Sequence, residues 1–386
     1  MTDRNQQIAL AFPRGSHQEV LIEGVTRFAS ENALRWSLTI APESLLLSVL
    51  DLEGWSGDGV LAALNTPEEL EYAAKLSMPV VNISSALAES PVPRTMVDNY
   101  AIGELAADHL FARGFREFAF FGLETIHYSL TRWRGFSESL EKQGCSCSKL
   151  LATPTFRFDG ATWVAQHEQL SNWLESLPRP CGVFVVSDYR ACQVLEACRE
   201  QGISVPDQIA VVGVDDEQVI CEHVTPTLTS VARNDALEGY KAAEMLDMLM
   251  KGEDLPSGEV IVPPSEVVTR DSTAAFAVSD ERLHKALAHL HEHIHKPITI
   301  EELAAHADVS RRWLEYAFRD VFRETPYQYI RRQRLMKAKQ LLADEPKASI
   351  TSVAKRTGFA SVKQMRIAFQ QAYGMSPGEF RRSFDS

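Results

Sequence analysis

The sequence lacks the features that define several large classes of protein. No apolar run in its 386 residues approaches the roughly 20 residues that a membrane-spanning helix needs. The opening stretch, MTDRNQQIALAF, has no basic segment followed by a long apolar core, so no secretory signal is visible. We therefore expect a cytoplasmic protein that does not associate with membranes.

Catalytic and redox motifs are also missing. The six cysteines form no C-x-x-C pair and no disulfide-framework spacing, which indicates buried reduced thiols. Neither a G-x-S-x-G elbow nor a phosphate-binding loop occurs, and GDG at 57–59 is better explained as a turn. Because no nucleophile and base stand in a recognisable arrangement, we expect neither an enzyme nor a bound cofactor.

The segment HLHEHIH, 289–295, is the one sequence feature that suggests a metal. His289 with His293, and His291 with His295, have the i, i+4 spacing that can hold an ion on a helix. No cysteine or acidic cluster converges nearby in the sequence. We therefore predict no metal site and interpret the segment as the first helix of a C-terminal domain.

Charge is distributed unevenly along the chain. The whole chain carries a net charge of −13, but residues 282–386 hold 19 Lys and Arg against 11 Asp and Glu, a net charge of +8. Residues 1–281 therefore carry −21. An acidic body with a basic C-terminal quarter predicts that only this quarter meets a polyanion.

Residues 6–270 alternate short apolar runs with amphipathic helical patterns. QIALAF, GVLAAL, EFAFFG and IAVVGV are typical of buried strands, each followed by helix-forming sequence. Near-continuous apolar strands between amphipathic helices indicate parallel sheets covered on both faces. We predict two α/β lobes over 1–270 and a linker over 271–280.

Residues 281–386 form helical patterns only, and these contain a repeat. AFRDVFRETP, 317–326, recurs as AFQQAYGMSP, 368–377. The i, i+3, i+4, i+7 spacing of a buried helical stripe is present in both copies: Leu314, Ala317, Phe318 and Val321, then Met365, Ala368, Phe369 and Ala372. A short helix and a turn precede each stripe. We therefore predict helix-turn-helix motifs at about 300–322 and 350–373.

The faces opposite these stripes are the predicted contacts with double-stranded DNA. Their donors and acceptors suit base edges: Arg311, Arg312, Glu315, Tyr316 and Arg319 in the first motif, and Lys363, Gln364, Arg366 and Ile367 in the second. Ser310 and Ser361, at the helix starts, are better placed for phosphates. The alternative is a solvated charged face, but two such faces in register on the basic quarter of an acidic chain favour DNA.

Residues 282–384 resemble an AraC-type DNA-binding domain. The resemblance rests on TGFAS (357–361), AFQQAYGMSP and GEFRR (378–382), and it covers both motifs. It implies sequence-specific binding to an operator. The stretch 367–370 is less basic than in many members of this family, so the second motif is expected to bind more weakly.

The acidic body resembles the ligand-binding part of LacI/GalR-type regulators, which is related to periplasmic sugar-binding proteins. The resemblance rests on DGVLAAL (58–64), PVVNIS (79–84), DNYAIGELAADHLFARGF (98–115), TRWRGF (131–136) and IAVVGVDDE (209–217). It implies a sugar held between the lobes, with Arg132 clamping ligand oxygens and Asp215 binding hydroxyls. The further ligand contacts that it implies are Arg14, His17, Asp98, Asn99, Ser187 and Asp188.

Physical chemistry supports these positions but leaves other roles open. They follow parallel strands, and open sheets bind ligands at the carboxyl ends of such strands. Carboxylates and a forked guanidinium suit vicinal hydroxyls. Asp215 could instead cap a helix, and Asp98 and Asn99 could form a turn. Arg132 could be a surface ion-pair partner, with Arg134 as the true ligand contact.

The combination of the two parts is itself informative. LacI/GalR members carry their DNA-binding part before the sensor, whereas here the first strand is expected at residue 6. A sensor of this type with a C-terminal AraC-type module resembles the bacterial xylose-operon regulators over nearly the whole chain. That resemblance implies a homodimeric activator of sugar-catabolic genes, with RNA polymerase as a further partner and a pentose such as xylose as effector. The rival interpretation is a cytoplasmic sugar-binding or transport-associated protein whose C-terminal helices bind a protein partner.

Overall fold

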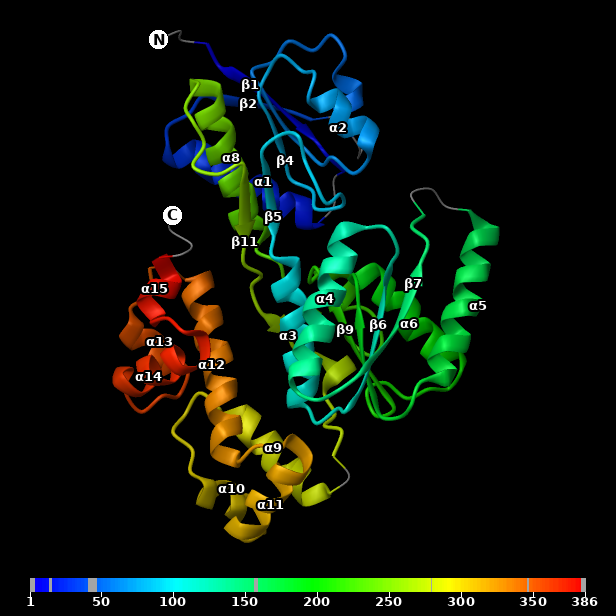
Figure 1. The fold of residues 1–386 in the computed structure, drawn as a ribbon, viewed down its shortest axis with the longest axis vertical. Coiled ribbons are helices and arrows are strands. Elements are labelled where there is room, and N and C mark those ends of the chain that lie inside the picture. Colours follow the sequence, from blue (N-terminus) through cyan, green and yellow to red (C-terminus); the bar gives the residue numbers. More distant parts are fainter. Residues whose placement is uncertain are drawn as a thin grey trace.

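The computed structural model describes residues 4–13, 16–40, 47–155, 159–278, 280–345 and 347–382. Over these ranges the chain forms two α/β lobes and then a group of helices (Figure 1). This confirms the predicted fold class, a two-lobed sensor with parallel sheets followed by an all-helical part. None of the helices in these ranges combines the length and the apolar character needed to cross a bilayer.

The first lobe is built on a six-stranded parallel sheet in the order β11-β5-β4-β3-β1-β2. Its strands are β1 (Gln6–Ala11), β2 (Trp36–Thr39), β3 (Gly59–Ala62), β4 (Val80–Asn82), β5 (Arg94–Val97) and β11 (Glu259–Val262). Its helices are α1 (Ser16–Glu31), α2 (Pro67–Ala73), α8 (Asp235–Lys251) and a short 3-10 helix, Val49–Leu52. Successive side chains of a strand point to opposite faces. Ile8 and Leu10 therefore pack against α1 and α8, while Ala9 and Ala11 pack against the other two helices.

The second lobe repeats this design with the strand order β12-β10-β9-β8-β6-β7, in which β12 alone pairs antiparallel. Its strands are β6 (Glu117–Leu123), β7 (Cys147–Ala152), β8 (Cys181–Val185), β9 (Ile209–Val214), β10 (Thr229–Val231) and β12 (Val267–Val268). Its helices are α3 (Asn99–Ala112), α4 (His127–Lys142), α5 (Gly160–Ser176), α6 (Asp188–Glu200) and α7 (Gln218–Cys221). Phe120 and Phe184 pack under α3 and α4, whereas Phe121 and Val183 pack under α5 and α6.

Three segments connect the lobes: Asp98 between β5 and α3, residues 232–234 between β10 and α8, and residues 263–266 between β11 and β12. Figure 1 shows them passing between the upper and the right-hand lobe. In the second lobe α3 and α4 cross closely at two glycines. A Cβ atom on Gly103 would lie 2.2 Å from the Arg132 carbonyl oxygen, and one on Gly135 would lie 2.0 Å from that of Tyr100.

The remaining helices form two small cores joined by one long helix. They are α9 (Glu281–His293), α10 (Ile300–His306), α11 (Arg311–Phe322), α12 (Pro326–Asp344), α13 (Ile350–Arg356), α14 (Val362–Tyr373) and α15 (Pro377–Arg382). Leu314, Phe318 and Tyr329 belong to the first core, and Ala338 and Phe369 to the second. Because α12 contributes to both cores, it fixes the two units relative to each other. Its start is held by a capping box between Thr325 and Gln328, with Pro326 at the first helical position.

This helical part packs against the second lobe near the end of α3 (Figure 1). The Tyr329 hydroxyl donates a hydrogen bond to the Ala112 carbonyl oxygen at 2.6 Å and is fully buried. The Lys337 ammonium lies 2.7 Å from a carboxylate oxygen of Glu266, in the segment that joins the lobes. The helices of the C-terminal part therefore contact both the second lobe and one of the inter-lobe connections.

Candidate functional site

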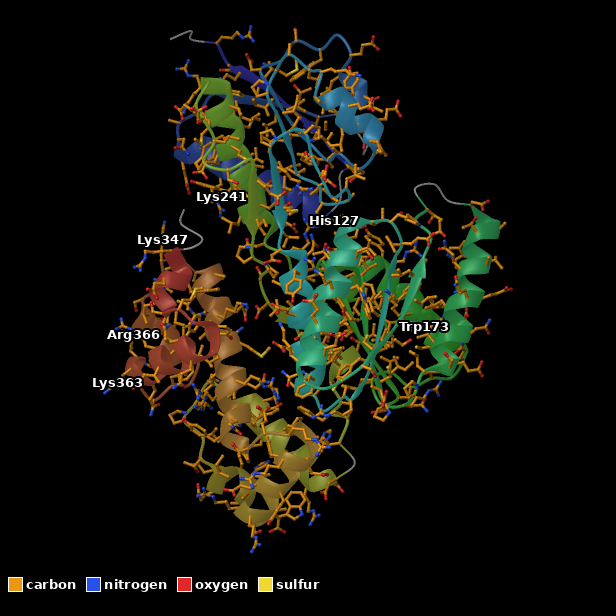
Figure 2. All side chains as sticks on the ribbon, viewed as in Figure 1. His127, Trp173, Lys241, Lys347, Lys363 and Arg366 are labelled. Carbon is orange, nitrogen blue, oxygen red and sulfur yellow. The ribbon has the colours of Figure 1, made fainter. Side chains whose placement is uncertain are left out.

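The strands of the second lobe end at a junction with the first lobe. This junction brings together three of the predicted sugar contacts, Asn99, Arg132 and Asp215. The backbone amides of His127 and Tyr128 donate to the carbonyl oxygens of Ala86 and Ser85, at 2.8 and 3.0 Å. Figure 2 shows His127 at the end of α4 that faces the first lobe. We refer to this region as the lobe junction.

Arg132 lies at the lobe junction and not on the surface. It is 3% exposed. Its Nε donates to Asn99 Oδ1 at 2.9 Å, its Nη1 donates to the Val186 carbonyl oxygen, and its Nη2 is 3.9 Å from Asp215 Oδ1. Arg134 is exposed on the other side of α4, with its guanidinium 5.4 Å from the ring centre of Tyr100. Of the two arginines considered from the sequence, only Arg132 reaches the junction.

Asp215 lies between two arginines. It follows β9 with a φ of +106° and does not cap α7, whose N-cap residue is Glu217. Its Oδ1 is 3.9 Å from Arg132 and 3.8 Å from Arg233. Both distances exceed the roughly 2.7–3.2 Å of a good N–H···O hydrogen bond. The carboxylate is therefore attracted by both guanidiniums without being fully occupied by either.

Burial and charge act in opposite directions on the two arginines. Burial lowers the pKa of Arg132, and the nearby Asp215 offsets only part of that shift. Burial would also lower the pKa of Arg233, but its carboxylate neighbours Asp235, Glu238 and Asp215 raise it above its usual value. Arg233 pairs with Asp235 at 3.0 Å and with Glu238 at 2.8 Å. The junction therefore holds two charged guanidinium groups in fixed positions.

Asp188 and Ser187 make their hydrogen bonds within the second lobe. Asp188 is fully buried, and its oxygens accept hydrogen bonds from Ser230 Oγ at 2.7 Å and from the Glu217 amide at 2.9 Å. A Cβ atom on Gly213 would lie 2.1 Å from Asp188 Oδ1, so only glycine leaves room for this carboxylate. Ser187 caps α6. Both side chains thus support the second lobe, and their role as ligand contacts stays a prediction.

Asp98 and Asn99 have different roles at the crossing between the lobes. Asp98 caps α3 by accepting a hydrogen bond from the Ala101 amide at 2.9 Å, the turn-forming role left open above. Asn99 donates to Ser85 Oγ of the first lobe at 3.0 Å and accepts from Arg132. Asn99 therefore links the first lobe to Arg132. Arg14 lies outside the described residues, and His17 is the second residue of α1, with its side chain outside the description.

The predicted DNA contacts of the first motif lie on the outer face of α11. Arg311, Arg312, Tyr316 and Arg319 are exposed, and Glu315 is half-buried. Arg311 pairs with Glu315 at 2.9 Å, and the Arg312 guanidinium lies 5.6 Å from the ring centre of Tyr316. The Ser310 hydroxyl accepts from the Trp313 amide, so it caps the end of the helix where phosphates are bound most readily.

The second motif presents a matching face on α14. Figure 2 shows Lys363 and Arg366 directed outward, and Gln364 and Ile367 are also exposed. Ser361 caps this helix as Ser310 caps α11. Arg311, Gln364 and Ile367 line one shared cavity of about 450 Å³. The two faces therefore open onto the same side of the helical part.

Comparison with known proteins agrees with this architecture. A periplasmic binding protein-like domain model matches residues 107–273, and a helix-turn-helix domain model matches residues 303–383. The xylose operon regulatory protein of Escherichia coli strain K12 is 30% identical over 388 residues, which cover 99% of this chain and 98% of the relative. The chain belongs to the xylose operon regulatory protein family.

Two further matches extend over nearly the full length of this chain. The xylose operon regulatory protein of Haemophilus influenzae is 27% identical and covers 99% of both chains. A solved structure of a xylose-binding transcription activator covers 99% of both chains, with 27% identity and a TM-score of 0.64. The chain is thus a transcriptional regulator with an AraC-type DNA-binding part, which confirms the function predicted from the repeat and the charge asymmetry. Its relatives are named as regulators, not enzymes.

The regulator also has junction residues that sequence reasoning missed. Arg233, in one of the inter-lobe connections, pairs with three carboxylates. The Tyr128 ring centre lies 5.1 Å from the guanidinium of Arg132. Arg233 had a usable signal, because it lies two residues after the end of a buried strand. Tyr128 had none, because its position depends on how α4 meets the first lobe.

Proposed function

We propose that this regulator binds a pentose, with D-xylose as the first candidate, between its two lobes, and that sugar binding changes its affinity for operator DNA. The observation that carries the proposal is the group of Arg132, Asp215 and Arg233 at the lobe junction. Its two guanidiniums and one incompletely paired carboxylate supply the donors and acceptors that vicinal hydroxyls need. Relatives named for the xylose operon support xylose as effector.

Each junction residue has a separate role in this proposal. Asp215 accepts hydrogen bonds from two neighbouring hydroxyls of the sugar. Arg132 donates through Nη2, because its other nitrogens are engaged by Asn99 and by a backbone carbonyl. Tyr128 supplies an aromatic face beside Arg132. His17 and Arg14 remain candidate ligand contacts.

On DNA, we assign base contacts to the exposed side chains of α11 and α14. Arg311, Arg312 and Arg319 suit guanine edges, Gln364 suits adenine, and Glu315 can accept from cytosine. Ser310 and Ser361 would contact phosphates. Helix α12 has 19 residues and so is about 28 Å long, close to the roughly 34 Å between successive major-groove faces. The remaining candidate contacts are Tyr316, Lys363, Arg366 and Ile367.

The route from sugar to DNA runs through α3 and the inter-lobe connections. Asn99 at the start of α3 contacts Arg132, and Ala112 at its end accepts the hydrogen bond from Tyr329. Glu266, in the third connection, pairs with Lys337 of α12. A sugar that binds one lobe arrangement better than another shifts the population toward it. These contacts would then move the helical part with the second lobe.

Two further partners belong to the same proposal. A homodimer would carry four helix-turn-helix motifs, whose spacing would depend on the lobe arrangement. As an activator, the DNA-bound dimer would contact RNA polymerase. Neither partner is needed for the first test of sugar and DNA binding.

The test is isothermal titration calorimetry of the full-length protein with xylose, arabinose, ribose and glucose, followed by DNA binding with and without the sugar that binds. Arg132→Ala should weaken sugar binding at least tenfold, because the buried clamp is lost. Arg134→Ala, on the outer face of the same helix, is the matched control and should bind normally. If both variants bind sugar like the wild type, the junction is not the sugar site.

A further inference from the structure

A cavity of about 350 Å³ lies between the second lobe and the helical part, away from the lobe junction. Its walls come from the end of α3, from residues 265–269 beside an inter-lobe connection, and from α9, α12 and the end of α13. The volume falls within the range of small-molecule pockets, roughly 300–1,000 Å³. A ligand held here would contact the sensor and the DNA-binding part at the same time.

The cavity is positively charged although the chain as a whole carries −13. Its described lining includes four cationic side chains, Arg113, Arg334, Lys337 and Arg356, and a single carboxylate, Glu266. That carboxylate is already paired with Lys337 at 2.7 Å. Arg356 is paired with Glu345, which lies outside the lining. Arg113 and Arg334 are therefore the lining cations that have no carboxylate partner among the described residues.

Arg113 is the strongest indication of a missing anion. Arg113 is buried, with an exposed fraction of 8%. Its Nε donates to His109 Nε2 at 3.1 Å, and its guanidinium lies 5.4 Å from the ring centre of Phe276. Within the described residues it forms no salt bridge, and burial lowers its pKa to about 10. A buried charge without a paired partner is costly, so such arginines usually meet an anion.

Gln333 of α12 gives an independent indication in the same cavity. Among the described residues its buried Nε2 has no hydrogen-bond acceptor, and the residue lines the cavity. Buried amide donors are nearly always satisfied in native proteins. Arg113 from the second lobe, which forms no ion pair among the described residues, and Gln333 from the helical part, which has an unsatisfied amide, therefore line the same cavity. One ligand that carries several acceptor oxygens would satisfy both.

We propose that this cavity is a second effector site, which binds a small metabolite bearing a phosphate group. The forked guanidinium of Arg113 matches two phosphate oxygens, and the Gln333 amide donates to a third. Because its walls belong to both parts, the anion binds only the arrangement in which the helical part is docked on the second lobe. It therefore stabilises that arrangement and changes DNA affinity independently of the sugar.

The test uses the full-length protein and calorimetry with glycerol 3-phosphate and with inorganic phosphate, and with glycerol as the uncharged control. Glycerol 3-phosphate should bind, and glycerol should not. Tighter binding of glycerol 3-phosphate than of inorganic phosphate identifies an organic phosphate as the ligand class, and equal binding identifies the free ion. Failure of both anions to bind at millimolar concentration would overturn the proposal.

Two variants separate this site from the rest of the positive surface. Arg113→Gln should weaken binding of the anion at least tenfold and leave the affinity for pentose unchanged, whereas Arg134→Gln should alter neither. Gln333→Leu removes the unsatisfied amide, so the melting temperature of the free protein should stay the same or rise. The same substitution should still weaken binding of the anion. Wild-type anion affinity in both Arg113→Gln and Gln333→Leu would contradict the proposal.

Discussion

Replacing Gly135 with alanine tests how the crossing of α3 and α4 holds Arg132 in place. A Cβ atom at this position would lie 2.0 Å from the Tyr100 carbonyl oxygen, whereas ordinary contact begins near 3.4 Å. The helices must therefore separate by about 1.4 Å, the difference between these two distances. No flexible side chain can absorb this shift, because the atom that the new Cβ meets belongs to the backbone.

The separation acts on Arg132, which precedes Gly135 by one helical turn. Its hydrogen bond to Asn99 is 2.9 Å long and would stretch beyond the distance at which such bonds form. Overpacking of this kind costs about 1–3 kcal/mol of stability. Loss of a hydrogen bond to a charged group costs about 1.5–3 kcal/mol. If the whole loss appears in binding, the affinity for sugar falls on the order of 10- to 100-fold.

Urea unfolding and calorimetry with xylose measure the two effects on one preparation. Gly160→Ala is the matched control, because a Cβ atom there meets nothing within 4 Å, and it should change neither measurement. DNA binding without sugar should survive in Gly135→Ala, since the helical part has its own cores. A Gly135→Ala protein that binds xylose with wild-type affinity would refute the role assigned to the crossing.

Three further substitutions test other parts of the account. Burial, with a smaller contribution from Asp215, raises the pKa of Asp188 from 3.8 to about 8, so the folded state holds an extra proton and the free energy of unfolding falls as pH rises between these values. Asp188→Asn should flatten this pH dependence of stability in thermal melts. An unchanged pH dependence would mean that another group causes it. Arg312→Ala should cost about 1–3 kcal/mol on a specific site in fluorescence anisotropy, and an equal loss on random DNA would make Arg312 a phosphate contact. Tyr329→Phe leaves the buried Ala112 carbonyl without its donor and should cost about 1–3 kcal/mol of stability. It should also weaken the effect of sugar on DNA binding while the affinity for sugar stays the same. An unchanged effect of sugar on DNA binding would argue against the route through α3.

The helical repeat could be predicted from the sequence because its signal is local. Burial of one face of a helix depends on residues three and four positions apart. Leu314, Phe318, Met365 and Phe369 are all buried as expected. The stripe does not continue to Ala372, which is exposed. There α14 has reached its last turn, and Phe380 of α15 packs against Phe369 instead.

The lobe junction was harder to predict because it depends on long-range placement. The sequence indicates that Asp188 follows a strand, but not that Ser230 of another strand takes up its carboxylate. Likewise, the R-x-x-G-F pattern suggests a functional arginine, but the reason for its glycine, Gly135, is the carbonyl oxygen of Tyr100 on another helix, 35 residues earlier in the chain. The charge of Arg113 became informative only when the structure brought Gln333 into the same cavity.

The most direct test of the central claim is a DNA-binding titration of the full-length protein, with and without xylose, on a duplex that the protein itself selects from random sequences. We expect xylose to change the affinity of the wild-type protein for that duplex. We expect Asp215→Ala to bind it with the affinity of sugar-free wild type at every xylose concentration. If the wild-type protein binds the selected duplex equally with and without xylose and the other sugars, the sensor does not control the DNA-binding part. If Asp215→Ala still responds to the sugar, the sensor acts through another site.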